Sequence, residues 1–490
     1  MDSKKNKSKT YLNQRGYIIR KACFPDEEIQ RIKNELTVSP ILMQDYGIPP
    51  EKFTVYRENE SKLYIPKFYG INNFGKPEYD DTPTGKTINV KFASELRPNQ
   101  LEPVKLCIES FNKTGGGILS LPCGFGKTII GIYLICHMKC KTLIIVHKEF
   151  LLNQWIERIK DFIPDAKIGI IQQDKFDLDC DIAIGMLQSI AMKSYAPDAF
   201  NSFGFTIIDE CHRISSKVYS RALQKVSCKY ILGLSATPNR KDGLSKVLEW
   251  YSGPLIYEAK RELNVVPKVV RYKIIHESDV YSKIEELKNK KPNMSKMINN
   301  ICYFLYRTKL ISALIIDIFK SDDERNILIL SDRIKHLNDI ETLLIKSGLT
   351  DDDIGYYIGG TKQKHLDIAA KKRIILATYS MANEGLDIPS LNTLILASPK
   401  SDIVQALGRI MRKQAPKQVP TIYDFVDDFS VFTSQALKRL KEYRKKAYDI
   451  ENWTIDIDNN KTFQGIDKSN SKIKVNTKSN IVKFEGFDIV

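Results

Sequence analysis

A glycine-rich segment in the first third of the chain carries residue types that bind phosphate. The segment LPCGFGKT follows an apolar run and precedes a helical pattern, and Gly124 and Gly126 let its backbone N–H groups turn toward phosphate oxygens. Lys127 adds a positive charge for the β and γ phosphates, and the Thr128 hydroxyl suits Mg²⁺. The sequence therefore predicts a nucleoside triphosphate site, with a structural glycine turn as the alternative. The expected lining residues are Leu121, Pro122, Cys123, Gly124, Phe125, Gly126, Lys127 and Thr128.

Two carboxylates follow a second apolar run in the segment IIDECH. The carboxyl ends of parallel strands share one edge of a sheet, so we expect Asp209 and Glu210 to lie beside the glycine loop. Asp209 would hold Mg²⁺ through its water shell, and Glu210 would deprotonate the water that attacks the γ-phosphate. An exposed strand end is the simpler interpretation of a lone Asp-Glu pair, but the glycine loop favours catalysis. His212 would form a contact that links this site to the second domain, or it would cap the turn that follows.

Two arginines are candidates for the cation that phosphoryl transfer requires. Arg409 and Arg412 stand three residues apart in QALGRIMR, which places them on one face of a helix. A cation delivered to the transferring phosphate raises the rate by about 10³ to 10⁵. A surface ion pair is the alternative. Upstream, ATYSMANEGLDIP leaves an apolar run and presents Glu384, Gly385 and Asp387 in a loop expected at the same sheet edge.

Two series of short apolar runs must position these side chains. Each run is continuous rather than alternating, which is typical of parallel strands covered on both faces by helices. The sequence therefore predicts an α/β fold with two such domains in tandem. The first series is 117–121, 142–146, 182–186, 205–209 and 230–235, and the second is 326–331, 354–358, 373–378, 393–398 and 421–426.

The remaining segments differ in composition from these two series. We expect a small N-terminal accessory domain in 1–90, the first α/β domain in 91–258, a linker or insertion in 259–300, the second domain in 301–448 and a partly disordered C-terminal tail in 449–490. Aromatic side chains gather in the N-terminal segment, where they would stack on bases or, as we favour, form a core or docking face. They are Tyr64, Phe68, Tyr69 and Phe74.

Composition narrows the functional classes. The 490 residues carry a formal charge of +16, spread along the chain, which indicates a polyanionic partner or a solubilising surface. No apolar run approaches the ~18 residues that a membrane span needs, and the basic N-terminus lacks the apolar region of a secretion signal. The nine cysteines form no C-x-x-C pair, so a structural zinc site is not expected. Reduced thiols indicate an intracellular, reducing compartment.

An ordered series of motifs resembles the superfamily 2 helicases of the DExH-box type, over roughly Leu96 to Asp428. The resemblance implies tandem RecA-like P-loop domains that hydrolyse ATP with Mg²⁺ while they move on nucleic acid. In chain order the matching segments are LRPNQ for adenine recognition, LPCGFGKT for motif I, IIVHKEFLLNQW for motif Ia, MLQS for motif Ic, DECH for motif II, SAT for motif III, NILILSDR for motif IV, ATYSMANEGLDIP for motif V and QALGRIMR for motif VI.

The same resemblance implies further site residues. Those implied for ATP binding, besides the glycine loop, are Arg97, Gln100, Gly385, Asp387 and Gln405. Those implied for coupling hydrolysis to movement are His212, Ser235 and Thr237. Those implied for contacts with the nucleic-acid backbone are His147, Lys148, Gln188, Ser189, Ser331 and Arg333.

Within the superfamily, GLSATPNRKDGL and NEGLDIP look most like the branch with the TFIIH-type DNA translocase, the phage recombination helicase and the poxvirus transcript-release helicase. The resemblance favours DNA as substrate, 3′ to 5′ movement and a role with the transcription machinery. Lys241 stands where the TFIIH-type members have Glu. An RNA helicase and a nucleotide-gated binding ATPase without unwinding are the alternatives, whereas Glu210 argues against a P-loop kinase. The Lys-, Ile- and Asn-rich composition suggests a large DNA virus, hence a host cytoplasm or virion.

Overall fold

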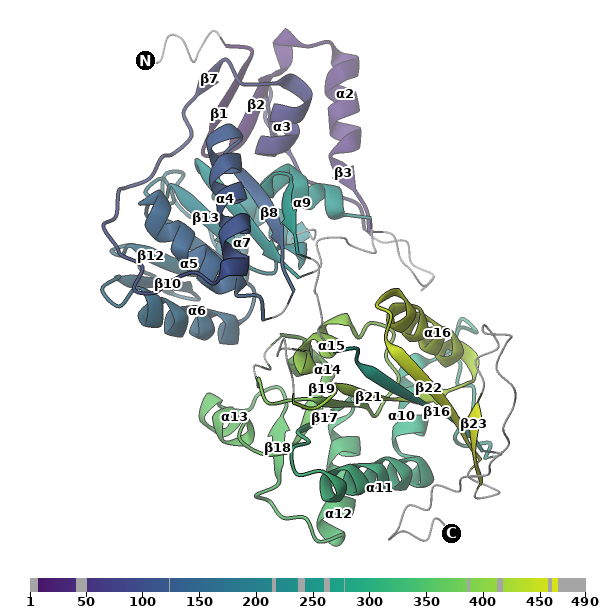
Figure 1. Ribbon diagram of the computed structural model, residues 1–490. Helices are drawn as coiled ribbons and strands as arrows, with labels where there is room; N and C mark the ends of the chain where they lie inside the picture. Colours follow the sequence, from purple (N-terminus) through teal and green to yellow (C-terminus); the bar gives the residue numbers. More distant parts are fainter. Residues whose placement is uncertain are drawn as a thin grey trace. The chain divides into compact units, whose positions relative to one another are not determined.

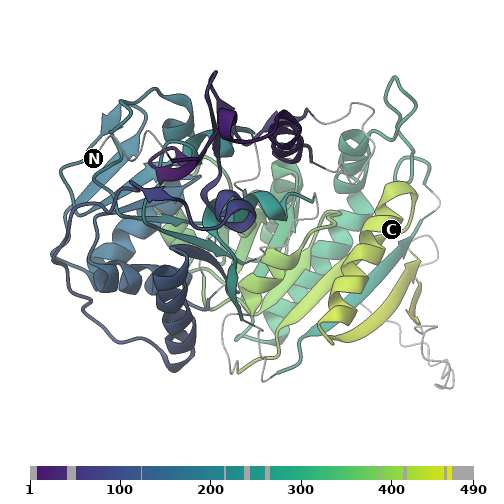
Figure 2. The same ribbon diagram turned by 90° about the horizontal axis from the view of Figure 1, so that it is seen from above.

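The structure is a computed structural model that forms two compact units, Met1–Arg261 and Glu262–Val490 (Figures 1 and 2). Each unit is described by itself. The structure describes residues 8–40, 51–122, 124–213, 217–236, 243–259, 265–276, 278–384, 386, 388–411, 417–456 and 461–465, the last by backbone alone. Within these residues, no helix is both long enough and apolar enough to cross a membrane.

A five-stranded sheet with the order β5-β6-β2-β1-β7 begins the first unit. Its strands pair antiparallel except for β1 and β7, which run parallel. The strands are β1 (Thr10–Asn13), β2 (Gly16–Arg20), β5 (Arg57–Glu58), β6 (Lys62–Ile65) and β7 (Tyr79–Asp80). The helices are α2 (Asp26–Glu35) and α3 (Lys67–Phe74), and β3 (Thr37–Val38) pairs with β4 (Phe53–Thr54).

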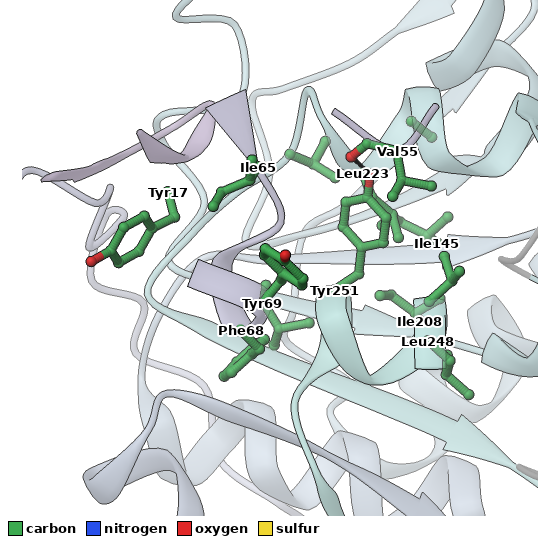
Figure 3. Packing of buried hydrophobic residues seen from close by; sticks show 14 of the residues in the cluster. Tyr17, Val55, Ile65, Phe68, Tyr69, Ile145, Ile208, Leu223, Leu248 and Tyr251 are labelled. Carbon is green, nitrogen blue, oxygen red and sulfur yellow. Dashed lines mark hydrogen bonds between the residues drawn. The ribbon is translucent and has the colours of Figure 1, made fainter. Parts of the chain in front are cut away.

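This N-terminal sheet shares one hydrophobic core with the rest of the first unit (Figure 3). Phe68 and Tyr69 of α3 are buried beside Tyr251 of helix α9 (Ser245–Ser252), so the predicted core role of these two aromatic side chains is confirmed. The Tyr251 hydroxyl donates a hydrogen bond to the Val55 carbonyl at 3.1 Å. The buried Lys67 ammonium donates to the Lys229 carbonyl at 2.8 Å. Apolar burial and these polar contacts together hold the two parts in a fixed arrangement.

The first unit also contains an eight-stranded sheet, which with its helices forms the first lobe. Its order is β11-β10-β12-β9-β13-β14-β8-β15, and it is parallel except for the β10-β11 pair. All five predicted strands are present, shifted by at most one residue. Because β13, β14 and β8 are neighbours, the segments that follow them emerge at one edge. The strands are β8 (Gly116–Ser120), β9 (Thr142–Val146), β10 (Ile168–Gln172), β11 (Lys175–Phe176), β12 (Ile182–Met186), β13 (Phe205–Ile208), β14 (Tyr230–Ser235) and β15 (Leu255–Glu258). The helices are α4 (Pro98–Lys113), α5 (Lys127–Met138), α6 (Glu149–Phe162), α7 (Leu187–Met192) and α8 (Lys217–Leu223), with α9.

The second unit holds another eight-stranded sheet, with the order β18-β19-β17-β20-β21-β16-β22-β23. It is parallel except for the β22-β23 pair. The strands are β16 (Lys268–Ile275), β17 (Ile327–Ser331), β18 (Ile354–Tyr357), β19 (Ile374–Thr378), β20 (Thr393–Leu396), β21 (Thr421–Asp427), β22 (Asp449–Asp456) and β23 (Lys461–Gly465). The helices are α10 (Met294–Cys302), α11 (Leu305–Ser321), α12 (Ile334–Lys346), α13 (Gln363–Ala369), α14 (Tyr379–Glu384), α15 (Val404–Ile410) and α16 (Ser430–Lys445).

Three strands of the second sheet lie where sequence patterns predict none. β16 falls in the segment expected as a linker, and β22 and β23 fall in the segment expected as a partly disordered tail. β16 pairs in parallel with both β21 and β22. The apolar side chains of β22 are few and irregularly spaced, so pairing with β16 rather than local hydrophobicity makes this segment a strand. The expected domain boundaries themselves remain predictions.

Candidate active site

The glycine loop joins β8 to the N-terminus of α5 and requires glycine for steric reasons. Gly124 and Gly126 have φ angles of +82° and +96°, a region that side chains with a Cβ rarely adopt. A Cβ on Gly126 would lie only 2.2 Å from Nε2 of Gln100. The loop therefore leaves its backbone free of side chains near the start of α5. The first N–H groups of a helix have no partner within the helix, so they can bind an anion there. Cys123 lies outside the described residues.

Gln100 supports this loop from the neighbouring helix α4. Its side chain is 2% exposed, and its Oε1 accepts a hydrogen bond from the backbone N–H of Arg97 at 2.9 Å. Its Nε2 donates to the Phe125 carbonyl at 3.1 Å. In this geometry Gln100 contributes to the nucleotide site by holding the loop, and the adjacent Arg97 is exposed.

Lys127 lies between the glycine loop and motif II. Its Nζ donates to the Leu121 carbonyl at 3.4 Å and lies 3.6 Å from Oε1 of Glu210. Both charged side chains are largely buried, which strengthens their attraction relative to a surface pair. Pro122 and Thr128, before and after the glycines, are half-buried. The structure thus brings the predicted phosphate-binding lysine and the predicted water-activating carboxylate together.

Asp209 and Glu210 follow β13 and differ in their environments. The two oxygens of Asp209 accept hydrogen bonds from Nε1 of Trp155 and from the backbone N–H of Glu210, each at 2.9 Å. Burial, followed by the negative charge of Glu210, raises the pKa of Asp209 to about 6. Burial also acts to raise the pKa of Glu210, but Lys127 and His212 outweigh it and hold that pKa well below its usual range. Glu210 therefore stays ionised over a wider pH range than Asp209, and its carboxylate is available as a hydrogen-bond and proton acceptor.

Glu210 has a strained backbone and a partner in motif III. Its φ of +49° is unusual for a residue with a side chain and is typical of constrained functional positions. His212 Nδ1 lies 3.3 Å from Glu210 Oε2 and 3.1 Å from Ser235 Oγ. This contact joins motif II to the end of β14, as the coupling prediction requires. Thr237 lies outside the described residues.

The donor set near α5 fits a magnesium ion. Thr128 stands in the first turn of α5, which packs against β13, and Asp209 follows that strand. Hydroxyl and carboxylate oxygens are the ligands Mg²⁺ prefers, and the ion usually takes only one or two protein ligands in addition to phosphate oxygens and water. In the part of the chain that the structure describes, no three His, Cys, Asp or Glu side chains gather into a self-sufficient metal site. Thr128 and Asp209 are therefore the residues that would hold the ion.

Trp155 is a positioning residue that sequence reasoning missed. It is the last residue of the motif Ia segment, and the sequence alone suggests no chemical role for it. In the structure it is 1% exposed, and its indole N–H donates to Asp209. A buried Trp needs a partner for its N–H, but the sequence does not show which one.

We expect Trp155→Phe to keep the packing but to lose the hydrogen bond that orients Asp209. The Mg²⁺ concentration for half-maximal ATPase activity should rise ~10-fold, because the hydrogen-bond partners of metal ligands typically contribute 10-fold to 100-fold to metal affinity. Titration of ATPase activity with Mg²⁺ measures this shift. Trp250→Phe is the matched control, because the Trp250 ring packs against that of Tyr69 in helix α3, with ring centroids 5.3 Å apart. An unchanged Mg²⁺ dependence in Trp155→Phe would contradict the positioning role.

In the second unit, Arg409 of α15 is tied to motif V. Its Nε donates to the Ala382 carbonyl at 2.5 Å, and its Nη1 donates to the Leu386 carbonyl at 2.8 Å. Gln405 is half-buried on the same helix. Gly385, Asp387 and Arg412 lie outside the described residues. The structure therefore fixes Arg409 within its own lobe, and its action on the triphosphate remains a prediction.

The predicted nucleic-acid contacts of the first unit lie near one another. Gln188 Nε2 donates to the His147 carbonyl at 3.3 Å, and Ser189 Oγ accepts from the Gln173 backbone N–H at 2.9 Å. His147 is only 6% exposed, whereas the adjacent Lys148 is half-buried. Lys148 and Gln188 are thus better placed than His147 for a direct phosphate contact, and all four roles remain predictions.

In motif IV, the direct contact predicted at Ser331 is not met by the geometry. Ser331 is fully buried, and its Oγ lies 3.1 Å from His336 Nδ1 and accepts from the Arg333 backbone N–H at 3.1 Å. The Arg333 guanidinium donates to Asn299 Oδ1 at 2.6 Å and to the Ser295 carbonyl at 3.0 Å. These contacts join motif IV to α10, because a buried hydroxyl and a planar guanidinium must find partners locally. The Ser331 hydroxyl therefore stabilises the turn between β17 and α12 rather than facing a ligand.

Two protein-family models match the chain, one in each unit. The family model described as the res subunit of type III restriction enzymes matches residues 93–240, and the helicase conserved C-terminal domain matches residues 308–414. A protein of Acanthamoeba polyphaga mimivirus, provisionally named an ATP-dependent RNA helicase, is 38% identical over 458 residues, which is 92% of this chain and 88% of the relative. A provisionally named helicase of Invertebrate iridescent virus 6 is 28% identical and covers 86% of this chain and 97% of the relative.

The fold is also found among solved structures. The ATP-dependent type ISP restriction-modification enzyme LlaBIII bound to DNA has a TM-score of 0.50 and 16% identity over 71% of this chain and 30% of its own. The viral relatives agree with the origin that the composition suggested. The motifs, the site geometry and these matches together show that the chain belongs to the superfamily 2 helicases, as an ATP-hydrolysing helicase that acts on nucleic acid.

Proposed function

We propose that the protein is a Mg²⁺-ATP-driven motor that moves along DNA. The observation that carries this proposal is the cluster of Lys127, Asp209 and Glu210 at one sheet edge, linked by His212 to Ser235. Lys127 would stabilise negative charge on the γ-phosphate, and Glu210 would take the proton of the attacking water. Thr128 and Asp209 would hold Mg²⁺, which supplies charge neutralisation when bound. His212 would pass the change at the γ-phosphate to motif III.

DNA is the favoured track for two reasons. The motif spellings resemble the branch that acts on DNA duplexes, and the solved structure with a similar fold is described as bound to DNA. The name of the mimivirus relative supports RNA as the alternative track. Phosphate contacts carry little sequence information, so we expect binding without sequence preference but with strong salt dependence. Movement from 3′ to 5′ and a role in transcription rest on the resemblance alone.

The test is ATPase stimulation by single-stranded DNA, duplex DNA and RNA of equal length. We expect the largest rise in kcat with DNA and none for Lys127→Ala with any polymer. Strand displacement on substrates with a 3′ or a 5′ tail then measures unwinding and its direction. Stimulation by RNA alone would establish the RNA helicase, and stimulation without strand displacement would leave the nucleotide-gated binding ATPase.

A further inference from the structure

A basic hollow lies inside the first unit, outside the ATP site. It has a volume of about 450 Å³ and opens between the N-terminal sheet and the segment that follows α7. The turn between β1 and β2 and strand β5 form one wall, and residues 194–197 and 224–225 form the other. This volume lies within the usual range of ligand pockets, about 300 to 1,000 Å³. The lining residues that matter are Arg15, Arg57, Tyr64, Tyr195 and Lys225.

Positive charge is concentrated in this hollow without compensating carboxylates. The one acidic lining residue, Glu58, is bound by Lys21 at 2.6 Å and by Lys33 at 2.7 Å. Across the described residues, no ion pair joins Arg15, Arg57 or Lys225 to an acidic side chain. Like charges held this close destabilise the fold, so their clustering indicates an anionic ligand.

Burial and neighbouring positive charges lower the pKa values of two basic groups in the hollow. Burial, with further contributions from Arg15 and Arg221, lowers the pKa of Arg57. Burial and then the charges of Arg57 and Arg221 lower the pKa of Lys225. Arg221 is exposed on α8 and thus adds to the same positive field. Four basic side chains therefore act on one region of the surface.

Two tyrosines give the hollow aromatic faces. Tyr64 is half-buried, and the Arg15 guanidinium lies 5.7 Å from its ring centroid. Tyr195 packs against Phe176 with ring centroids 4.8 Å apart. The Tyr195 hydroxyl donates to the Ser189 carbonyl at 3.1 Å, so the hollow touches motif Ic directly. The wall formed by residues 194–197 follows α7 directly, so it lies about one helix length from Gln188, ~9 Å for six helical residues.

The walls of the hollow are held together by specific contacts. Nε of Arg57 on the N-terminal sheet donates to Oε1 of Gln224 on the lobe at 2.6 Å. The Lys225 ammonium donates to the carbonyls of Ile190 and Ala191, both at 2.9 Å, and so caps the end of α7. With the shared core below them, these contacts make the hollow a preformed site, which lowers the entropic cost of binding.

We propose that this hollow binds single-stranded nucleic acid that continues from motif Ic, with phosphates against Arg15 and Arg57 and bases stacked on Tyr64 and Tyr195. The inference rests on the proposed function, since it assumes a nucleic-acid track across the first lobe. Arginine for phosphate and tyrosine for bases is the combination that single-strand sites use. Its volume is that of a small-ligand pocket, so we expect it to take a short stretch of single strand rather than a duplex. The N-terminal sheet is thereby part of the track.

The test measures binding of a fluorescent single-stranded DNA 20-mer and the equivalent RNA to the full chain as salt is varied. Arg15→Gln/Arg57→Gln should lower the slope of log K against log[salt] by ~1.4, or about 0.7 per phosphate contact. Tyr64→Leu should weaken binding by about five-fold or more, whereas Tyr64→Phe should restore it, because a ring of equal size still stacks. Lys105→Gln/Lys113→Gln on α4 is the matched control, since it removes two exposed positive charges elsewhere on the same unit.

Arg15→Gln alone separates binding from stability, because among the described residues its side chain forms no hydrogen bond or ion pair and its recorded partner is the Tyr64 ring. It should retain the thermal midpoint of the wild type and still lower the salt slope. An unchanged slope in both arginine variants would overturn the proposal, and so would an equal loss in the α4 control. A loss seen only with duplex DNA, or only with an acidic peptide as probe, would also overturn it. If the wild type binds no nucleic acid at all, the proposed function fails first.

Discussion

Glu210→Gln is expected to lower kcat for ATP hydrolysis by about 10² to 10⁴, the usual contribution of a positioned general base. The amide is nearly isosteric and can still contact His212, but it cannot accept the proton of the attacking water. Lys127 lies 3.6 Å from the lost charge, so its charge becomes less compensated and ATP affinity should be retained or rise. Steady-state hydrolysis at saturating nucleic acid measures kcat, and binding of a fluorescent ATP analogue measures affinity.

The matched control is Glu258→Gln, an exposed carboxylate at the end of β15 in the same sheet. It changes the net charge by the same amount and should leave both kcat and affinity unchanged. If Glu210→Gln keeps more than a tenth of the wild-type kcat, another group activates the water. A parallel loss of ATP affinity would instead indicate that Glu210 shapes the binding site.

The strands and the glycine loop were predictable because their causes are local. Continuous apolar runs specify buried parallel strands, and positive φ angles at Gly124 and Gly126 admit few other residues. The contact between Gln100 and the loop was not predictable, because it joins two segments by a side-chain hydrogen bond. The same is true of Trp155, whose partner Asp209 is 54 residues away in sequence.

The motif resemblance identified candidate residues in the second unit, but it did not reveal which contacts their side chains make. Ser331 and Arg333 match motif IV in spelling, yet the Ser331 hydroxyl links β17 to His336 of α12 and the Arg333 guanidinium binds Asn299 of α10. β22 has little local signal and is a strand because β16 and β23 pair with it on its two sides. Pairing partners and hydrogen-bond partners are tertiary information, which a single sequence does not display.

Arg409→Ala tests whether the second lobe supplies a cation to the triphosphate. If it does, kcat should fall by about 10³ or more with little change in ATP affinity, because the guanidinium acts on charge that develops during transfer. Arg409→Lys should recover only part of the rate, since an ammonium restores the charge but not the planar donor geometry. Single-turnover hydrolysis with bound nucleic acid measures the chemical step directly.

A structural role is the competing explanation, because Arg409 also donates to the carbonyls of Ala382 and Leu386. Arg325→Ala provides the comparison, since Arg325 likewise donates to a backbone carbonyl, that of Val419 at 2.8 Å, in the same unit. Loss of such bonds costs ~1 to 3 kcal/mol of folding free energy in either variant, so both should lower the unfolding temperature similarly. If only Arg409→Ala loses hydrolysis below that temperature, packing cannot explain the loss. If it hydrolyses ATP at the rate of Arg325→Ala, Arg409 only stabilises motif V, and the prediction that it supplies a cation to the triphosphate is wrong.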